Sequence, residues 1–367
     1  MGFPEDGSDT VASMPESSGE LTRLGWSDAF DDAWEELGRP GEPARVTRLD
    51  RGWSTAARSL AQAVGDDEPV RLRNIGADVA VGDWIVPSGD GERVEHVVAR
   101  TSAFTRRASF DGMRAVSHTL AANIDVVFIV HALGSPPSPR RLERELVLAF
   151  DSGADPVVVL TKTDLVDDPE PARAGLAEVA LGVPVVLASG TAGVGIEDLR
   201  SYAAGNRTLA FLGASGVGKS TLVNALVGSQ RQETSSVREG DQRGRHTTVA
   251  AELVPLPGEG WLIDTPGVRA VSLWLSGDGI ERAFSDVFDL MDHCRFRDCK
   301  HDREPGCAVQ QAISSGDLDP VRLHALEKLI EEEAALEEEQ RAREKAADRR
   351  AGGKKKPEAS EYDGMRE

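Results

Sequence analysis

The segment Gly213–Ser220, with the sequence GASGVGKS, has the pattern of a phosphate-binding loop. In this pattern glycines let backbone amides close around phosphate oxygens, Lys219 reaches the β and γ phosphates, and the Ser220 hydroxyl ligates Mg²⁺. An apolar strand-like run, 209–212, precedes the segment, and a helical stretch, 221–227, follows it. Because strand, loop and helix come in the order that the mechanism needs, the segment predicts a nucleotide site rather than a glycine-rich turn.

The sequence Thr161-Lys162-Thr163-Asp164 ends another apolar run and predicts which base is bound. An aspartate there can accept hydrogen bonds from N1 and N2 of guanine, and adenine lacks these donors. Thr161 stands in place of the more usual Asn, which should weaken the support of the loop without altering the base that is read. Ala188-Ser189-Gly190 would add a backbone contact to the guanine oxygen. These residues predict GTP in preference to ATP.

Two later segments predict a magnesium site. Asp264, at the end of the run 261–263, can hold a magnesium-bound water, and the Gly267 amide can contact the γ-phosphate. In the segment Gly244-Arg245-His246-Thr247-Thr248, one of the two threonines should meet Mg²⁺ and the γ-phosphate. The predicted magnesium contacts are therefore Ser220, Thr247, Thr248 and Asp264.

Hydrolysis by the protein alone should be slow, because Val268 stands where many signalling GTPases have a Gln that orients water. His246 is the nearest polar candidate to position water, and together with Lys219 it forms the predicted catalytic set. A histidine that serves only loop packing would explain His246 nearly as well. The predicted GTP-binding residues are Thr161, Lys162, Thr163, Asp164, Ser189, Gly213, Ala214, Ser215, Gly216, Val217, Gly218, Lys219, Ser220, Thr221 and Gly267.

All cysteines of the chain lie in one short window and, with a histidine, have the spacing of a metal site, Cys294-x₄-Cys299-x-His301-x₅-Cys307. Three thiolates and an imidazole fill a tetrahedral zinc site and leave no position open for water, so we expect a structural zinc ion. Such a site would hold a loop-rich element together and contribute folding free energy directly. His293 could compete as a ligand, but its adjacency to Cys294 would strain shared chelation.

The base-reading motif precedes the phosphate loop, which is an order that an ordinary GTPase does not show. A sheet-and-helix core tolerates such a cut, because termini lie close together at the surface and circular permutation leaves the packing unchanged. The β-branched runs 124–130 and 157–160, separated by a helical stretch, 140–150, predict a parallel sheet with helices on both faces. Ligands of such sheets bind beyond the carboxyl ends of the strands, where these motifs lie.

Short strand-like runs between residues 44 and 106 predict a small β-barrel, and the OB-fold is the commonest five-stranded barrel that binds oligonucleotides. Arg100 and Arg106 near its end are interleaved with Phe104 and Phe110, a composition suited to phosphates and bases. A solvated basic edge explains these residues equally well. Beyond residue 277 the sequence reads as helical apart from the cysteines, and it ends in a long exposed helix.

Lys and Arg number 42 and Asp and Glu number 62, and the resulting net charge of −20 argues against indiscriminate binding to nucleic acid. A local basic face remains compatible with this balance. The acidic segment 1–43 predicts a solvated, partly disordered extension with a short amphipathic stretch at about residues 24–37. Apolar runs fall far short of the roughly 18 residues that span a bilayer, and the N-terminus lacks the pattern of a signal peptide. We therefore expect a cytoplasmic protein without membrane contact.

Together these residues resemble the ribosome small-subunit-dependent GTPase A family, known as RsgA or YjeQ. The resemblance covers about residues 45–329 and rests on the permuted motif order, GRHTT at 244–248, DTPGVR at 264–269 and the cysteine pattern. It implies a multidomain protein with a central α/β circularly permuted P-loop GTPase. The domains that we expect are an acidic extension at 1–43, an OB-fold RNA-binding barrel at 44–108, the GTPase domain at 109–275, a helical zinc-binding domain at 276–340 and a charged tail at 341–367.

The resemblance further implies an enzyme that binds the small ribosomal subunit and its rRNA, hydrolyses GTP to GDP and phosphate late in maturation, and leaves the matured particle. It matches His246 to a histidine that the family is thought to use in hydrolysis. The segment 71–74 departs from the cysteine-containing, RG-rich strand of many relatives, so the contact of the barrel with RNA stays open. The alternative is a nucleotide-gated rRNA-binding scaffold with incidental hydrolysis. With either function, we expect the protein to act as a monomer.

Overall fold

The computed structural model describes residues 17–50, 52–106, 118–228, 251–264 and 277–352. The chain divides into two compact units, one of residues 1–105 and 119–274 and the other of residues 106–118 and 275–367. The first unit thus contains the barrel and the nucleotide motifs, and the second contains the cysteines. In the described part of the chain, no helix is both long enough and apolar enough to cross a bilayer.

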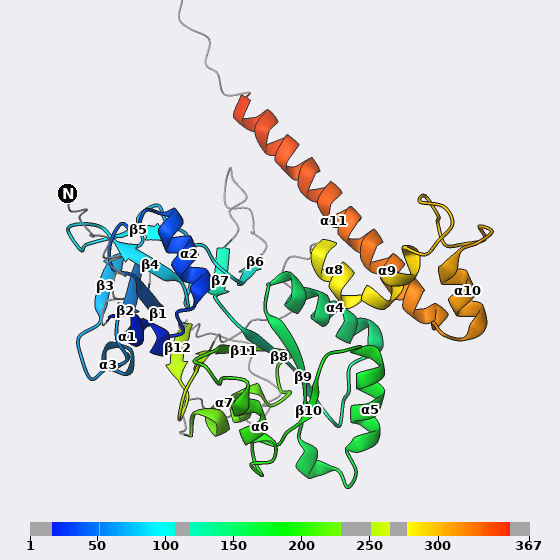
Figure 1. Cartoon of the computed structure of the whole chain (residues 1–367), viewed down its shortest axis with the longest axis horizontal. Coiled ribbons are helices and arrows are strands. Elements are labelled where there is room, and N and C mark those ends of the chain that lie inside the picture. Colours follow the sequence, from blue (N-terminus) through cyan, green and yellow to red (C-terminus); the bar gives the residue numbers. More distant parts are fainter. Residues whose placement is uncertain (1–16, 51, 107–117, 229–250, 265–276, 353–367) are drawn as a thin grey trace, which may run out of the picture. The chain divides into compact units, whose positions relative to one another are not determined.

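The first unit is built around a sheet whose inner strands run parallel (Figure 1). Neighbouring strands of this region are parallel in every pair, as the sequence predicted. All residues of the central strand are buried, so the sheet is covered on both faces there. In spatial order the parallel strands are β10 (Val185–Leu187), β9 (Asp155–Thr161), β8 (Val126–Ala132), β11 (Thr208–Leu212) and β13 (Trp261–Asp264).

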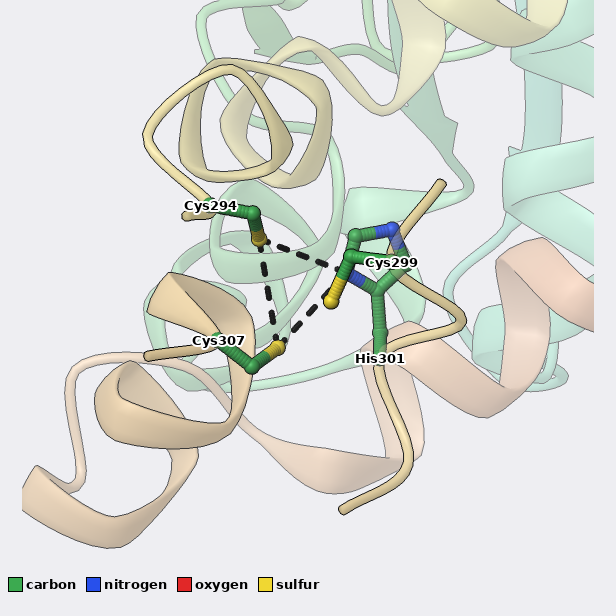
Figure 2. Close-up of side chains that lie close together, drawn as sticks. All are labelled: Cys294, Cys299, His301 and Cys307. Carbon is green, nitrogen blue, oxygen red and sulfur yellow. Dashed lines mark hydrogen bonds between the residues drawn. The ribbon is translucent and has the colours of Figure 1, made fainter. Parts of the chain in front are cut away.

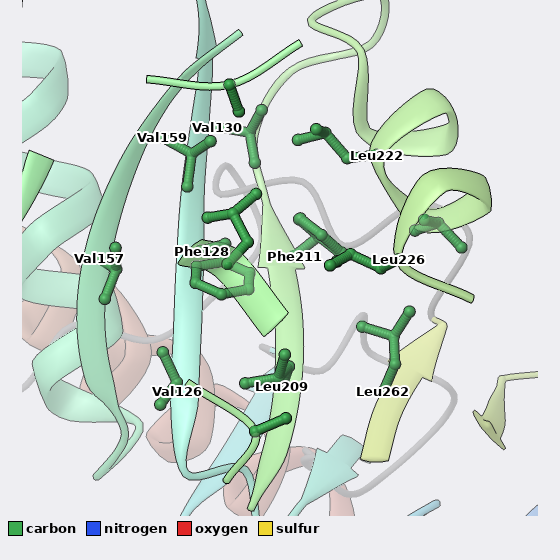
Figure 3. Packing of buried hydrophobic residues seen from close by; sticks show 14 of the residues in the cluster. Val126, Phe128, Val130, Val157, Val159, Leu209, Phe211, Leu222, Leu226 and Leu262 are labelled. Atoms are coloured by element: carbon green, nitrogen blue, oxygen red, sulfur yellow. The ribbon is translucent and has the colours of Figure 1, made fainter. Parts of the chain in front are cut away.

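An apolar core fixes the positions of these strands. Phe128 on β8 lies with its ring centroid 5.4 Å from that of Phe211 on β11, and Leu222 and Leu226 pack in the same cluster (Figure 3). Burying a side chain of this size contributes about 1.5 to 3 kcal/mol to folding. Leu222 and Leu226 belong to one of the helices of this half of the unit, which are α4 (Pro139–Asp151), α5 (Glu170–Val179), α6 (Ile196–Ser201) and α7 (Lys219–Val227). The strand ends that carry the motifs are therefore anchored in tightly packed structure.

The same sheet continues into a group of short antiparallel strands. β12 (Glu252–Pro255) pairs with β13 on one side and with β1 (Ala44–Asp50) on the other. Within this group β1 pairs with two further strands, and a bridge between Arg73 and Arg93 joins the two ends of the group. The remaining strands of the group are β2 (Trp53–Ala57), β3 (Val70–Arg73), β4 (Trp84–Pro87) and β5 (Val94–Val97). They surround a small apolar core, which agrees with the predicted β-barrel.

The sequence missed two elements of this region, β2 and the short helix α3 (Leu60–Val64). The residues of β2 are Trp-Ser-Thr-Ala-Ala, which carry little of the hydrophobic alternation that marks a strand. A further pair, β6 (Ala103–Arg106) and β7 (His118–Ala122), forms a separate two-stranded sheet.

The prediction of a solvated N-terminal extension is wrong for residues 17–37, although the amphipathic stretch expected within it, residues 24–37, does contain a helix. This segment forms α1 (Ser17–Arg23) and α2 (Asp28–Glu36), and Leu24, Trp26 and Phe30 are buried. The Trp26 ring packs edge-on against Trp84 of β4, with the centroids 4.7 Å apart. Apolar side chains of α2 and of the linker before it therefore pack against β4, and the acidic residues between them account for the misleading composition.

Backbone and side-chain hydrogen bonds also tie this segment to the parallel sheet. The buried guanidinium of Arg45 on β1 donates to the Leu24 carbonyl and, at 2.7 Å, to the Thr208 hydroxyl at the start of β11. The Trp261 indole of β13 donates to the Arg23 carbonyl at 3.0 Å. Burial lowers the pKa of Arg45 to about 10, while the charges of aspartates nearby act in the opposite direction. Segment 17–37, barrel and parallel sheet thus share one buried polar network.

Two residues that the sequence suggested for RNA contact are held by contacts within the fold instead. Arg100 donates to both carboxylate oxygens of the buried Asp83, at 2.7 and 2.8 Å. Burial raises the pKa of the Asp83 carboxyl, and the hydrogen bond from Arg100 opposes that rise. Phe104 is only 2% exposed. Arg100 is thus held by a buried carboxylate and Phe104 by burial of its ring, so these two residues do not form the free basic and aromatic edge that the sequence suggested.

In residues 277–352 the second unit is helical apart from the cysteine region, as predicted. Its helices are α8 (Gly277–Ala283), α9 (Ser285–Met291), α10 (Ala308–Ser315) and α11 (Pro320–Gly352). Arg322 of α11 lies over the Phe284 ring at 4.3 Å and donates to both carboxylate oxygens of Asp286, at 3.1 and 2.8 Å. Leu326 and Leu329 are buried, whereas Ile330 is 45% exposed. The first turns of α11 therefore carry its packing within this unit.

Candidate nucleotide and metal sites

The phosphate loop, Gly213–Ser220, connects β11 to α7 in a conformation that requires glycine. Gly213 has a φ of 150°, and a Cβ atom there would lie 2.5 Å from the carbonyl oxygen of Val130. Lys219 begins α7 and its ammonium group donates to the carbonyl oxygens of Gly213 and Ala214, at 2.8 and 2.7 Å. The lysine charge is thus held inside the loop, at the N-terminus of a helix, which is where an anionic phosphate binds.

The base loop, Thr161–Asp164, is joined to the phosphate loop by two side chains. The Thr161 hydroxyl contacts the Val217 carbonyl and lies 3.2 Å from the His131 carbonyl on β8. Because a hydroxyl carries one proton, these two carbonyls must share it. The Lys162 ammonium donates to the Gly216 carbonyl at 2.9 Å. The threonine that replaces the usual asparagine therefore still connects the two loops.

Asp164 is exposed, and its carboxylate is oriented by a buried serine. The Ser189 hydroxyl donates to Asp164 Oδ1 at 2.5 Å, and Ser189 itself is only 1% exposed. The neighbouring Gly190 lies against α7, since a Cβ atom there would be 2.9 Å from the Thr221 carbonyl. That close approach was not predicted, although an isolated glycine in a motif is the signal for it. The structure thus brings the Ala188–Gly190 segment beside both the base loop and the phosphate-binding helix.

The predicted magnesium residues are only partly covered by the structure. Ser220 lies in the first turn of α7, and Asp264 ends β13, the strand directly beside β11. Both follow adjacent parallel strands, so their oxygens are at the edge of the sheet where a phosphate-bound Mg²⁺ would need them. His246, Thr247, Thr248 and Gly267 lie outside the described residues.

The four predicted metal ligands come together in the second unit (Figure 2). Their donor atoms all lie within 4.8 Å of one another. Cys294 follows α9, Cys307 caps the start of α10, and their sulfurs are 3.9 Å apart. That separation is close to the ~3.8 Å edge of a tetrahedron with Zn–S bonds of about 2.3 Å. His301 completes the cluster with Nδ1 3.5 Å from the Cys294 sulfur, so the residues fit a closed thiolate and imidazole site for zinc.

Residues around the ligands shape the loop that carries them. The Glu304 carboxylate accepts from the backbone amides of Lys300, Asp302 and Arg303 at 2.9 to 3.1 Å, and these bonds lower the pKa of its carboxyl group. Gln310 donates from its side chain to the His301 carbonyl at 2.6 Å and from its backbone amide to the Cys307 sulfur. Neither residue was predicted to have a role, and spacing alone contains no signal for Gln310.

The electrostatic surroundings of the thiols differ. Desolvation opposes ionisation of Cys294, but hydrogen bonds to its sulfur from the backbone amides of Val309 and Ala308 and from the Cys307 and Cys299 thiols together lower its pKa. Desolvation and the neighbouring sulfurs raise the pKa of Cys299 to about 11. His293, considered as a competing ligand, points its Nδ1 to the Asp289 carbonyl at 2.7 Å and does not belong to the cluster.

Comparison with known proteins places this arrangement in one family. The RsgA GTPase family model matches residues 97–274. A small ribosomal subunit biogenesis GTPase RsgA from Streptomyces coelicolor is 39% identical, with 88% of this chain and 89% of that protein covered. The protein of that name from Syntrophotalea carbinolica is 37% identical, with 84% and 88% covered.

Solved structures agree on the fold. YjeQ from Thermotoga maritima matches with a TM-score of 0.59 and 24% identity, covering 80% of this chain and 98% of its own. YloQ, described as a circularly permuted GTPase, matches with a TM-score of 0.57 and 24% identity, covering 80% and 95%. The rotated motif order and the strand arrangement are therefore those of a permuted GTPase. Since its similarity to the RsgA proteins extends over most of the length of both chains, this chain belongs to the RsgA family of GTPases.

Proposed function

We propose that this GTPase binds the small ribosomal subunit and its rRNA, hydrolyses GTP to GDP and phosphate late in subunit maturation, and leaves the matured particle. The proposal of nucleotide binding is supported above all by the contacts of Thr161 and Lys162, which join the base loop to the phosphate loop. The relatives are named small ribosomal subunit biogenesis GTPases, and these names support the small subunit as the partner.

In the nucleotide site, Asp164 reads guanine while Ser189 holds its carboxylate, and the phosphate loop with Lys219 binds the phosphates. Mg²⁺ would be held by Ser220, by Thr247 or Thr248, and through water by Asp264, and it would neutralise charge between the β and γ phosphates. We assign to His246 the positioning of the attacking water, because Val268 cannot orient it.

The other parts of the chain would provide the contacts with the particle. We infer an OB-fold for the barrel at 44–108, supported by five short strands closed by the bridge between Arg73 and Arg93. The zinc ion would be structural, since its four protein ligands leave no open position. The GTPase domain at 109–275, the zinc domain at 276–340 and the tail at 341–367 complete the organisation that we propose, for a protein that acts as a monomer in the cytoplasm, where small subunits mature.

The test is the rate of GTP hydrolysis with and without purified small subunits. Completing a GTPase site in trans raises the rate by about 10³ to 10⁵ in other systems, so a large stimulation is expected. His246→Ala should keep GTP and subunit binding and lose most of the stimulated rate. His324→Ala is the matched control, because this imidazole is 68% exposed on α11.

The outcome also decides between the enzyme and the alternative. A rate that small subunits do not change would contradict the proposal and favour a nucleotide-gated rRNA-binding scaffold whose hydrolysis is incidental. If His246→Ala keeps the full stimulated rate, the protein still acts as an enzyme, and a group other than His246 positions the water.

A further inference from the structure

The outer face of β2 and β3 carries a tryptophan flanked by two arginines. Arg71 and Arg73 alternate with Leu72, which is fully buried, so both arginines lie on the outer face. Trp53 on β2 is the direct cross-strand partner of Arg73. The guanidinium carbons of Arg73 and Arg71 lie 5.1 and 5.6 Å from the centroid of the Trp53 ring. We call Trp53, Arg71 and Arg73 the stacking face.

The charges of this face are largely available to a ligand. The Arg71 side chain is 65% exposed and approaches Asp50 only at 4.0 Å. Arg73 is exposed and makes no ion pair with a residue that the structure describes, and the exposed Arg93 is its bridge partner. By contrast, Arg48 on β1 is paired with Glu252 at 3.1 Å. A positively charged aromatic surface thus occurs on a protein whose net charge is −20.

A second arginine and tryptophan pair shows what a packing contact looks like in this chain. Arg39 lies 5.2 Å from the Trp34 ring centroid, but its guanidinium also has Glu35 at 3.7 Å. The Trp34 indole donates to the Gly41 carbonyl at 3.1 Å, so this ring is fixed by its own loop. The stacking face differs in having two arginines at one ring and little carboxylate neutralisation.

We propose that the stacking face binds an unpaired RNA base together with its flanking phosphates. The half-buried indole ring and the guanidinium groups beside it are planar groups on which any base can stack, and exposed guanidinium groups can also pair with phosphates. Bases inside a duplex are already stacked and cannot reach such a ring, so the ligand should be single-stranded. This inference rests on the proposed function and deepens it by naming the barrel face and the kind of RNA.

Binding of the full-length protein to a labelled short oligouridylate, and to an RNA duplex of equal length, tests this inference. The single strand should bind more tightly than the duplex. Trp53→Ala should weaken binding of the single strand between about fivefold and about a hundredfold, whereas Trp53→Phe should retain most of the affinity. Retained GDP binding by both variants will show that they are folded.

Salt dependence separates the two kinds of contact. Arg73→Gln should weaken binding and reduce the slope of log K against log salt by about 0.7 for each lost phosphate contact. Trp53→Ala should lower the affinity and leave that slope unchanged, because stacking releases no counterion. Arg39→Gln is the matched control and should change neither quantity.

The inference would be overturned if Trp53→Ala bound the oligouridylate as tightly as the wild type does, or if the wild type bound single strand and duplex equally well. Loss of small-subunit binding by Trp53→Ala without any effect on naked RNA would also overturn it, and would instead indicate a protein partner. If small subunits fail to stimulate even the wild-type GTPase, the proposed function fails, while the oligouridylate measurements still decide the stacking face.

Discussion

The nucleotide region and the cysteine loop, residues 294–307, achieve ordered sites in opposite ways. The nucleotide loops begin at strands that are buried in an apolar core, where Phe128, Phe211 and Leu222 pack together. In the cysteine loop, Cys307 is the only buried residue. Packing prepares the first site before any ligand arrives, whereas the second has to be held by its own ligands and by the metal that they bind.

The contrast between the two sites predicts that the cysteine loop unfolds when it loses its metal ligands, and this is the largest effect that we expect. Zinc binding contributes about 10 to 16 kcal/mol of apparent free energy in small zinc domains, so Cys299→Ser should lose zinc and unfold residues 294–307. Bound zinc, limited proteolysis and GDP affinity are the measurements, and GDP affinity should not change. His293→Ala, beside the cluster but outside it, should keep its zinc. A zinc-free variant that resists proteases would show that the loop folds by packing after all.

The reverse experiment weakens the packed core. Leu222→Ala removes a side chain that is 1% exposed and should lower the free energy of unfolding of the first unit by about 2 to 5 kcal/mol. Urea unfolding measures this loss, and the zinc content should remain that of the wild type. Val321→Ala, at a side chain 65% exposed, is the control and should have little effect. Loss of zinc from Leu222→Ala would contradict the independence of the two sites.

A smaller effect will show whether segment 17–37 belongs with the packed region. Gly25 has a φ of 92°, and a Cβ atom there would lie 2.9 Å from the Asn206 carbonyl and closer still to the Arg45 guanidinium. Gly38 has a φ of 77° with open space around it. Both alanine variants carry the backbone penalty of about 1 to 2 kcal/mol, but only Gly25→Ala should also disturb the Arg45 network. Thermal unfolding should therefore separate them, and equal melting temperatures would count against the network.

The smallest predicted effect concerns the link between the base loop and the phosphate loop. Thr161→Val keeps the shape of the side chain but leaves the Val217 carbonyl without its hydroxyl partner. Such a loss costs about 1 kcal/mol, so GDP affinity measured by calorimetry should fall about fivefold. Thr161→Ser retains the hydroxyl and should bind GDP nearly as the wild type does. Equal affinity of the valine and serine variants would mean that packing alone positions the phosphate loop.

Much of the fold was predictable because its signals are local. The central strands β8 and β9 are rich in β-branched residues, and β11 includes the predicted run 209–212. Where the signal was weak, prediction failed. The strand β2 has small and polar residues, and segment 17–37 hides its apolar face among acidic residues. The phosphate loop and the metal ligands were found because residue type and short spacing define their chemistry.

The sequence by itself determined which chemical groups this protein has and the local order in which they occur. Only the tertiary structure decided which of them meet. Thr161 and Lys162 contact carbonyls 56 and 54 residues away, Arg100 donates to a buried carboxylate, and the Trp53 ring lies close to two arginines of another strand. Periodicity and spacing describe neighbours along the chain, whereas burial and contacts between distant residues depend on how all strands and helices pack together.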